Sequence, residues 1–144
     1  MKYALVTGGS RGIGRAVCVA LAREGYAILV NYASNRSAAL ETVRLVEEAG
    51  GSAELIPFNV AFRREVDEAL EKWEDAHPGE FISVLVNNAG IREDNLMIFM
   101  QDEQWNKVLE TNLFGFSADV FLIRLKRELS FSSPSIINVP PKIL

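Results

Sequence analysis

The length of 144 residues, with 49% hydrophobic and 24% charged residues, is typical of one globular domain that can bury a core. The net charge of −4 comes from dispersed carboxylates, which excludes the basic field that a nucleic acid or an anionic membrane surface would need. No apolar stretch approaches the roughly 20 residues of a membrane span and no signal segment precedes the first apolar run, so we expect a cytoplasmic protein.

Apolar runs that suit buried strands alternate along the chain with segments of helical period. We expect strands at residues 3–7, 26–31, 53–58, 82–87 and 136–139. Three triples at helical spacing each predict a buried stripe: Ile13, Val17 and Leu21, then Ala39, Val43 and Val46, then Val66, Leu70 and Trp73. A fourth helix is expected from Asp102 to about residue 129. This alternation predicts an α/β fold, a doubly wound parallel sheet of the Rossmann type, in a single domain over residues 1–144.

Two residues that often carry chemistry occur once each in the chain. Cys18 cannot form an internal disulfide and lies among small apolar residues, so we expect a buried, unreactive thiol, which suits a reducing compartment. His77 precedes Pro78, and the sequence offers it no second histidine or nearby cysteine as a metal partner. We expect His77 at the surface and no metal site.

The glycine-rich run at residues 7–14, Thr-Gly-Gly-Ser-Arg-Gly-Ile-Gly, lies between the first strand and the first helix. Backbone N–H groups of such a turn can approach a pyrophosphate, and the helix adds partial positive charge. The spacing differs from the Gly-x-Gly-x-x-Gly fingerprint, and the alternative is a purely structural turn, which needs one glycine rather than four. The predicted cofactor contacts in this run are Gly8, Ser10, Arg11, Gly12, Ile13 and Gly14.

The end of the second strand should decide between the two nicotinamide dinucleotides. An acidic residue there would bind the ribose hydroxyls of NAD, yet no carboxylate occurs between Glu24 and Glu41. Residues 31–36 read Asn-Tyr-Ala-Ser-Asn-Arg, and Arg11 is expected nearby, so a 2′-phosphate would meet cations and hydroxyls. This predicts NADP(H), with Asn31 and Ser34 among its contacts; the alternative for Arg36 is a solvated surface charge.

Three runs together resemble a known family: residues 7–14, Asn87-Asn88-Ala89-Gly90 after the fourth strand, and Asn112 within Glu-Thr-Asn-Leu. The chain is similar to the short-chain dehydrogenase/reductases. The longer match through residues 91, 94–96 and 102–106 resembles the bacterial 3-oxoacyl-acyl-carrier-protein reductase branch, whose members reduce a ketoacyl thioester with NADPH in fatty-acid synthesis. The resemblance is dense over residues 3–116 and thin over 117–139.

The resemblance also implies roles for particular residues. Asn59 and Val60 would flank the adenine, although the family more often has aspartate in place of Asn59. Asn88, Ala89 and Gly90 would line the path of the ribose and pyrophosphate. Asn112 would be the catalytic asparagine that holds a water in the proton relay. For the complete protein, the branch implies a ketoacyl substrate carried on acyl carrier protein and a homo-oligomer, with neither nucleic acid nor membrane as a partner.

The residues that carry the family's proton transfer have no match in this sequence. The family uses a tyrosine with a lysine four residues later and a serine after the fifth strand. Here the tyrosines are followed at that spacing by Thr7, Val30 and Arg36, and the chain after residue 139 reads Pro-Pro-Lys-Ile-Leu. We therefore expect a cofactor-binding portion without the family's C-terminal catalytic portion. The alternative is a non-catalytic nucleotide-binding or interaction module that has lost the serine, tyrosine and lysine.

Overall fold

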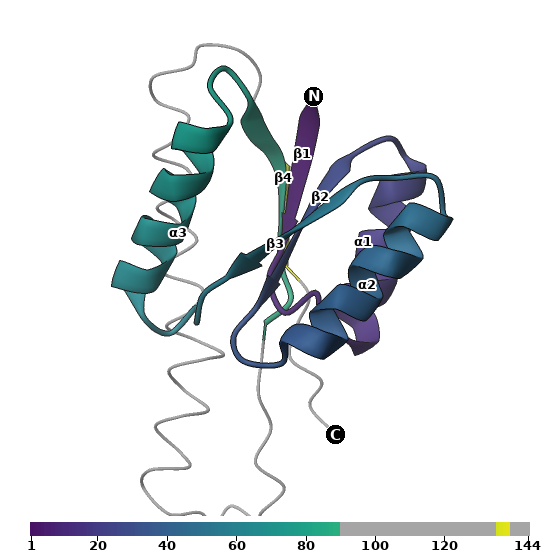
Figure 1. Ribbon diagram of the computed structural model, residues 1–144, viewed down its shortest axis with the longest axis horizontal. Helices are drawn as coiled ribbons and strands as arrows, with labels where there is room; N and C mark the ends of the chain where they lie inside the picture. The colour runs from purple at the N-terminus through teal and green to yellow at the C-terminus, as the bar shows by residue number, and fades with distance from the viewer. Residues whose placement is uncertain (90–134, 139–144) are drawn as a thin grey trace, which may run out of the picture.

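The computed structural model describes residues 1–89 and 135–138. These residues form a five-stranded, fully parallel sheet in the order β3-β2-β1-β4-β5. The strands are β1 (Lys2–Val6), β2 (Ala27–Tyr32), β3 (Ala53–Pro57), β4 (Phe81–Asn87) and β5 (Ser135–Asn138), and the helices are α1 (Gly12–Arg23), α2 (Arg36–Glu48) and α3 (Arg63–Ala76). Helices α1 and α2 cover one face of the sheet and α3 covers the other (Figure 1). The predicted doubly wound α/β fold is confirmed, and each strand lies within one residue of its expected limits.

The two helical layers create two separate cores. Successive residues of a strand point to opposite faces, so Leu5 and Leu29 pack toward α3 whereas Val6 and Val30 pack toward α1 and α2. Residues 4–6 of β1 and 27–32 of β2 are all buried. This burial on both faces explains why the strands are continuous apolar runs without polar alternation.

The buried stripe of α1 is shifted by one position along the helix from the predicted stripe. The helix buries Gly14, Cys18 and Ala22, whereas Ile13 is 39% exposed. Small side chains on the inner face let α1 approach the sheet and the glycine-rich run closely, which larger residues would prevent. Cys18 is buried as expected, and burial raises the pKa of its thiol to about 12, so the thiol stays protonated at neutral pH.

The other two predicted stripes agree better with the structure. Helix α3 buries the expected residues Val66, Leu70 and Trp73. In α2, Thr42 takes the buried position between Ala39 and Val46, and Val43 is only half-buried. Because α2 lies close to the glycine-rich run, a hydroxyl group at this position can find backbone acceptors there, as described below.

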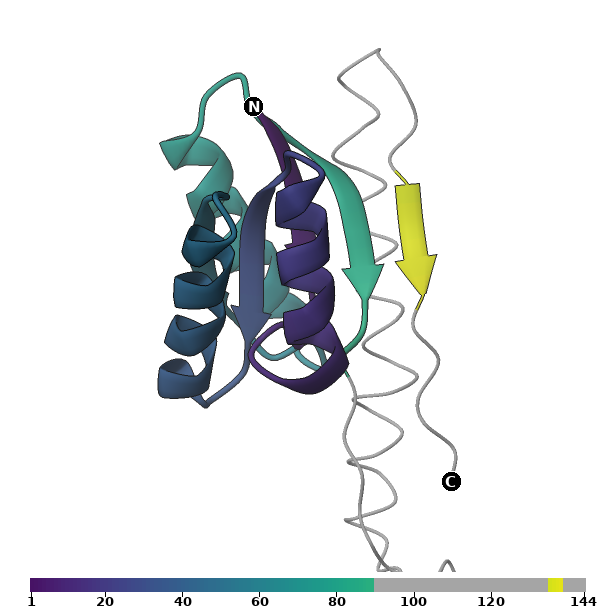
Figure 2. The same ribbon diagram turned by 90° about the vertical axis from the view of Figure 1, so that its right-hand side faces the viewer.

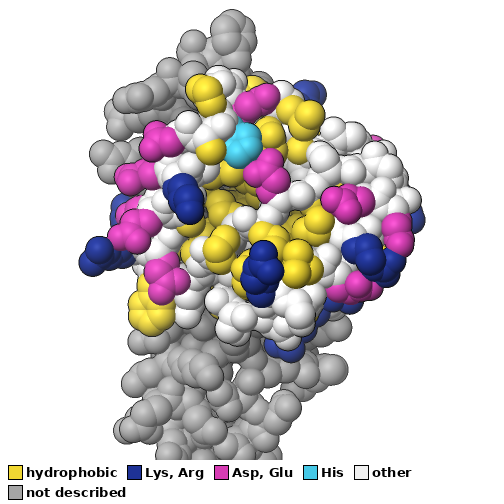
Figure 3. Space-filling view, in the orientation of Figure 1, with side chains coloured by type: hydrophobic (Ala, Val, Ile, Leu, Met, Phe, Trp, Pro, Cys, Tyr) yellow, Lys and Arg dark blue, Asp and Glu magenta, His cyan; other side chains and the backbone are white. Residues whose placement is uncertain are grey.

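His77 lies at the surface, as expected, but neighbouring rings cover much of its side chain (Figure 3). Its ring stacks on Trp73 with centroids 4.7 Å apart and meets Tyr3 edge-on at 5.7 Å, and its side chain is only 22% exposed. Nδ1 lies 2.8 Å from the carbonyl oxygen of Trp73, and Nε2 lies 3.2 Å from Oε1 of Glu54. His77 thereby joins the end of α3 to the start of β1 and to β3. The spacing of four residues between Trp73 and His77 lets the two rings stack.

The surface of the domain carries charges of both signs. On the face shown in Figure 3, acidic and basic side chains alternate over the outer sides of α2 and α3, and apolar side chains gather between these helices. Among the helices in residues 1–89 and 135–138, none has the length and apolar character needed to cross a membrane. The expected helix from Asp102 lies outside the described residues.

We predict that the contacts of His77 make stability depend on pH. The hydrogen bond to the carbonyl of Trp73 and, less strongly, the carboxylates of Glu54 and Glu80 raise the pKa of His77, although burial opposes this. A pKa raised by folding contributes stability that is fully present below the unfolded value of about 6.5 and is lost as pH rises through the folded value. The melting temperature should therefore fall between about pH 6 and 8 by more in the wild type than in His77→Gln. Equal falls in both proteins would contradict this prediction.

Candidate cofactor site

The glycine-rich run lies where the winding of the sheet reverses. Strand β1 has β2 on one side and β4 on the other, because the connection through α1 leads from β1 to β2 whereas the connection through α3 leads from β3 to the far side of β1. Residues 7–11 join the carboxyl end of β1 to α1 at this point, and the strands end at the same edge of the sheet (Figure 2). Doubly wound sheets bind ligands in the crevice outside such a switch point. We call residues 7–14 the glycine loop.

The start of α1 touches the glycine loop backbone directly. A Cβ atom added at Gly14 would lie 2.3 Å from the carbonyl oxygen of Gly8 and 2.5 Å from Nδ2 of Asn88. These distances leave room for no side chain. The Nδ2 group of Asn88 donates hydrogen bonds to the carbonyl oxygens of Thr7 and Gly8 at 3.0 and 3.1 Å. Glycine at position 14 is therefore required by packing within the protein itself.

The outer side of the loop has the character of an anion site. Gly12 has a φ of +56°, and a Cβ atom there would meet nothing within 4 Å, so the backbone at the helix start is accessible. Arg11 occupies the N-cap position, but its side chain makes no capping hydrogen bond, and the first turn of α1 contains no acidic residue. The first N–H groups of a helix have no partner within the helix and carry partial positive charge. This combination fits a pyrophosphate.

Thr7 anchors the loop to the end of β4 through its hydroxyl group. The Oγ1 atom donates to the carbonyl oxygen of Val86 at 3.2 Å and accepts from the backbone N–H groups of Asn88 and Ala89, both at 3.0 Å. The side chain is almost completely buried. This role of Thr7 was not predicted from the sequence. A threonine directly after an apolar strand is the available signal, because its buried hydroxyl must find partners.

Asn31 supports the loop from beneath, in place of the direct cofactor contact expected from the sequence. Its side chain is 2% exposed, and its Oδ1 accepts from the N–H of Gly8 at 3.2 Å. Its Nδ2 donates to the carbonyl oxygens of Ile56 and Phe58 at 3.1 and 3.0 Å. The polar atoms of the side chain are thus engaged inside the protein. Asn31 connects the glycine loop with the end of β3.

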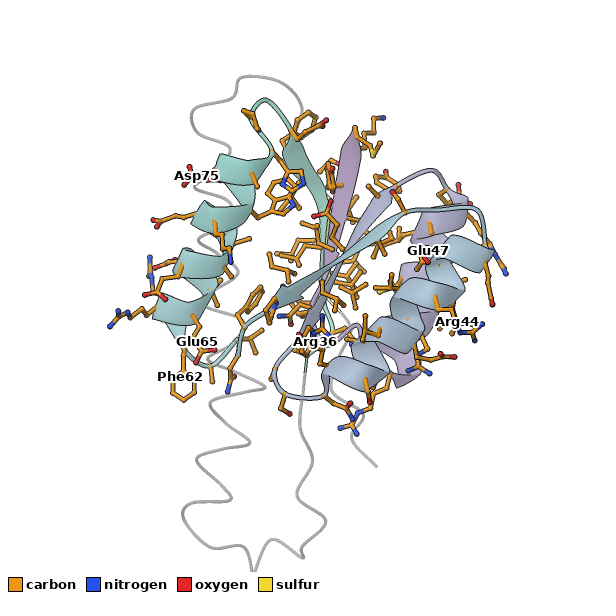
Figure 4. The ribbon with its side chains drawn as sticks, viewed as in Figure 1. Arg36, Arg44, Glu47, Phe62, Glu65 and Asp75 are labelled. Carbon is orange, nitrogen blue, oxygen red and sulfur yellow. The ribbon has the colours of Figure 1, made fainter. Side chains whose placement is uncertain are left out.

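Residues 33–36, which comprise the connection between β2 and α2 and the first residue of α2, are exposed near the carboxyl ends of the strands. Asn35 is the N-cap of α2, and its Oδ1 accepts from the N–H of Ala38 at 3.0 Å. Arg36 lies at the start of α2, beside the carboxyl ends of the strands (Figure 4). Ser34 and Arg36 are exposed, as is Arg11 on the glycine loop. The described part of this edge therefore presents a hydroxyl and two guanidinium groups, and no carboxylate lies within residues 33–36.

Asn59 and Val60 follow β3 at this edge. The Oδ1 of Asn59 accepts from the N–H of Ala61 at 3.0 Å, and the N–H of Asn59 donates to Oε2 of Glu65 in α3 at 2.8 Å. Val60 is mostly buried against the core beneath α3. The structure brings to the sheet edge these two residues and the expected loop and strand-end residues Gly8, Ser10, Arg11, Gly12, Ile13, Gly14, Ser34, Asn88 and Ala89. Gly90 and Asn112 lie outside the described residues.

Comparison with known proteins agrees with this arrangement. A family model described as short chain dehydrogenase matches residues 2–139, so the chain belongs to the short-chain dehydrogenase family, as the motifs indicated. The 3-oxoacyl-acyl-carrier-protein reductase FabG of Staphylococcus epidermidis is 44% identical over 114 residues, which cover 79% of this chain and 46% of the relative. The 3-oxoacyl-acyl-carrier-protein reductase of Synechocystis is 42% identical over 141 residues, covering 96% and 55%. The chain thus spans about half the length of these relatives.

A solved structure shares the same fold. The promiscuous reductase LugOII, described as catalysing keto-reduction at C1 during lugdunomycin biosynthesis, is 36% identical and superposes with a TM-score of 0.79. The match covers 95% of this chain and 61% of LugOII. The similarity therefore extends over nearly the whole of the present chain.

We predict that alanine is tolerated far less at position 14 than at position 12. Gly14→Ala forces the Cβ against the carbonyl of Gly8, and overpacking that must move backbone should cost about 3 kcal/mol or more. Gly12→Ala meets no atom but must hold a positive φ, which costs about 1–2 kcal/mol. The free energy of unfolding from urea titration measures both. Equal losses would show that the contact between α1 and the loop is looser than the structure indicates.

Proposed function

We propose that the protein is an NADP(H)-dependent reductase of 3-oxoacyl thioesters, to which this chain contributes the cofactor-binding half. The observation that carries the proposal is the uncapped, glycine-lined start of α1 beside a β2–α2 connection that has no carboxylate. The first feature fits a pyrophosphate and the second fits a 2′-phosphate. The names of the two relatives support the substrate class.

The choice of NADP(H) over NAD(H) depends on charge at the end of β2. NAD-binding proteins of this architecture place a carboxylate there, which binds the ribose hydroxyls and would repel a phosphate. In this chain Ser34 and Arg36 are exposed at that place, and Arg11 projects from the neighbouring glycine loop. Arginine forms charge-assisted, often bidentate hydrogen bonds with phosphate. None of these residues supplies the carboxylate that would bind the free ribose hydroxyls of NAD(H).

The residues of this chain would bind and orient the cofactor. Bound NADPH supplies a hydride for the ketone carbon of the substrate. The glycine loop would hold the pyrophosphate, and Asn88 and Ala89 at the end of β4 would border the ribose, where small groups permit close approach. Gly90 is proposed to continue this border. Asn112 is proposed, from the family resemblance, to hold the water of the proton relay.

The alternative function is a nucleotide-binding or interaction module without catalysis. It is favoured by one observation, that none of the three tyrosines precedes a lysine by four residues. Tyr32, which precedes Arg36 by four, is buried in the core beneath α1 and α2 and so is not available as a proton donor. Tyr3 lies at the opposite edge of the sheet, beside His77. The proton donor of the proposed reductase would therefore not be one of these tyrosines.

The proposal includes the setting of the reaction. The ketoacyl group would be carried on acyl carrier protein, as the names of the relatives indicate for those proteins. The enzyme would act in the cytoplasm as a homo-oligomer, with neither a nucleic acid nor a membrane as its partner. The mixed charges over α2 and α3 on the face shown in Figure 3 agree with the absence of a polyanionic partner there.

We predict that NADPH binds at least about tenfold more tightly than NADH, and that Arg11→Ala removes most of the difference. A hydrogen bond to a charged group contributes about 1.5–3 kcal/mol, which corresponds to roughly 10- to 100-fold in affinity. Fluorescence titration of both cofactors measures the ratio. Arg44→Ala is the matched control, because Arg44 lies on α2 in exposed ion pairs with Glu41 and Glu48. A ratio near one in the wild type would refute the choice of NADP(H).

We further predict that the protein isolated from its natural source oxidises NADPH when an acetoacetyl thioester is added. The loss of NADPH absorbance measures the rate, and NADH in place of NADPH serves as the control. A protein that binds NADPH but leaves it unoxidised with acetoacetyl thioesters of both carrier protein and coenzyme A would favour the module over the reductase.

A further inference from the structure

The guanidinium group of Arg15, in the first turn of α1, donates hydrogen bonds to two separate segments of the chain. Its Nε donates to Oγ1 of Thr42 at 3.0 Å, and its Nη2 donates to the carbonyl oxygens of Ser10 and Ala38 at 2.7 and 3.0 Å. All three acceptors are neutral. The acceptors belong to two different segments, since Ser10 lies in the glycine loop whereas Ala38 and Thr42 lie in α2. One half-buried guanidinium group thus connects the loop with α2.

Thr42 strengthens the same connection from the other side. Its side chain is completely buried, and its Oγ1 lies 3.0 Å from the carbonyl oxygen of Gly9, 3.1 Å from that of Ser10 and 3.4 Å from that of Ala38. A hydroxyl has one proton, so it donates to one of these carbonyls at a time while accepting from Arg15. Valine would fill a similar volume and could make none of these bonds.

We call the hydrogen bonds of Arg15 and Thr42 to the glycine loop and to α2 the bridge. The bridge ends next to residues 33–36, which would face the proposed 2′-phosphate. The carbonyl of Ala38 accepts from Arg15, and the N–H of the same residue donates to the side chain of Asn35. Ser34 and Arg36 flank Asn35 directly. A continuous series of hydrogen bonds therefore runs from the backbone of the glycine loop, through Arg15 and Ala38, to residues 33–36.

The charge of Arg15 is not used in an ion pair within the described part of the chain. Glu41 lies within reach of its field, but the Glu41 carboxylate is hydrogen-bonded to Arg44. Partly burying a guanidinium among neutral oxygens sacrifices hydration. The planar guanidinium group of Arg15 holds its N–H donors in fixed directions, so that it can bind two segments at once. Lysine has no such planar arrangement of donors.

We propose that Arg15, acting with Thr42, is a positioning residue that fixes residues 33–36 relative to the glycine loop and thereby sets the preference for a 2′-phosphate. The inference rests on the proposed NADP(H) function. The pyrophosphate and the 2′-phosphate belong to one ligand, so their two binding segments must keep a constant separation. NADH contacts the loop but has no 2′-phosphate, so it is less sensitive to that separation.

The test is the ratio of the NADH and NADPH dissociation constants, measured by titration of the full chain and its variants. Coupling between two sites is typically about 5- to 150-fold, and we expect Arg15→Met and Thr42→Val each to lower the ratio about tenfold. Affinity for NADH should change by less than about threefold in both. Arg15→Lys keeps the charge but loses the planar guanidinium group and should lower the ratio as well. Thr42→Ser keeps the hydroxyl, and Arg44→Met removes an arginine elsewhere on α2; both should retain the wild-type ratio.

Two results in folded variants would overturn the inference. An unchanged ratio in Arg15→Lys and Thr42→Val would show that the bridge does not affect the 2′-phosphate, and equal losses for both cofactors would show that it only maintains the loop. Thermal melting identifies any variant that fails to fold. If Arg15→Met fails to fold, Arg15→Lys and Thr42→Val test the inference. A wild-type chain without NADPH preference would overturn the choice of NADP(H) itself, an outcome that is distinct because it appears before any substitution.

Discussion

The contact between Gly14 and the carbonyl of Gly8 is the constraint on which the site depends. It brings the start of α1 against the loop that leaves β1, at a separation no side chain would allow. The helix start, with its unpaired N–H groups, is therefore held at the point where the sheet reverses direction. The same closeness is possible because the inner face of α1 consists of the small residues Gly14, Cys18 and Ala22. The packing of α1 in its core and the position of the candidate anion site thus depend on the same small residues.

Side chains from three neighbouring parts of the fold hold the glycine loop in place. Asn88 and Thr7 join it to the end of β4, Asn31 joins it to β3, and Arg15 with Thr42 joins it to α2. A loop rich in glycine would otherwise be mobile, and a mobile loop would lose entropy on binding. Hydrogen bonds to the loop carbonyls and N–H groups avoid this loss while leaving the outer side of Gly12 open. Preorganisation of this kind is what a binding site for a charged ligand requires.

The carboxyl ends and the amino ends of the parallel strands have different roles. The glycine loop and the exposed polar residues of the candidate site lie at the carboxyl ends of the strands. At the amino ends, the ring of Trp73 stacks on His77 and contacts Tyr3 edge-on. Bonds at the amino ends connect α3, β1 and β3, and they contribute to stability without contacting the site. This division is the usual one in doubly wound sheets, where ligands bind beyond the carboxyl ends of the strands.

The sequence by itself determined the class of fold, the limits of the strands and the position of the glycine loop. These features depend on local signals: apolar runs, a helical period, and glycines between a strand and a helix. Only the tertiary structure decided which polar side chains are buried. Asn31 was expected to face the cofactor and lies beneath the loop, and Thr42 takes a core position in α2. The burial of each depends on partners that come from other elements of the fold, such as Phe58 for Asn31 and Gly9 for Thr42. Periodicity along one helix also cannot distinguish two adjacent stripes, and in α1 the approach of the loop selected the one with the smaller residues.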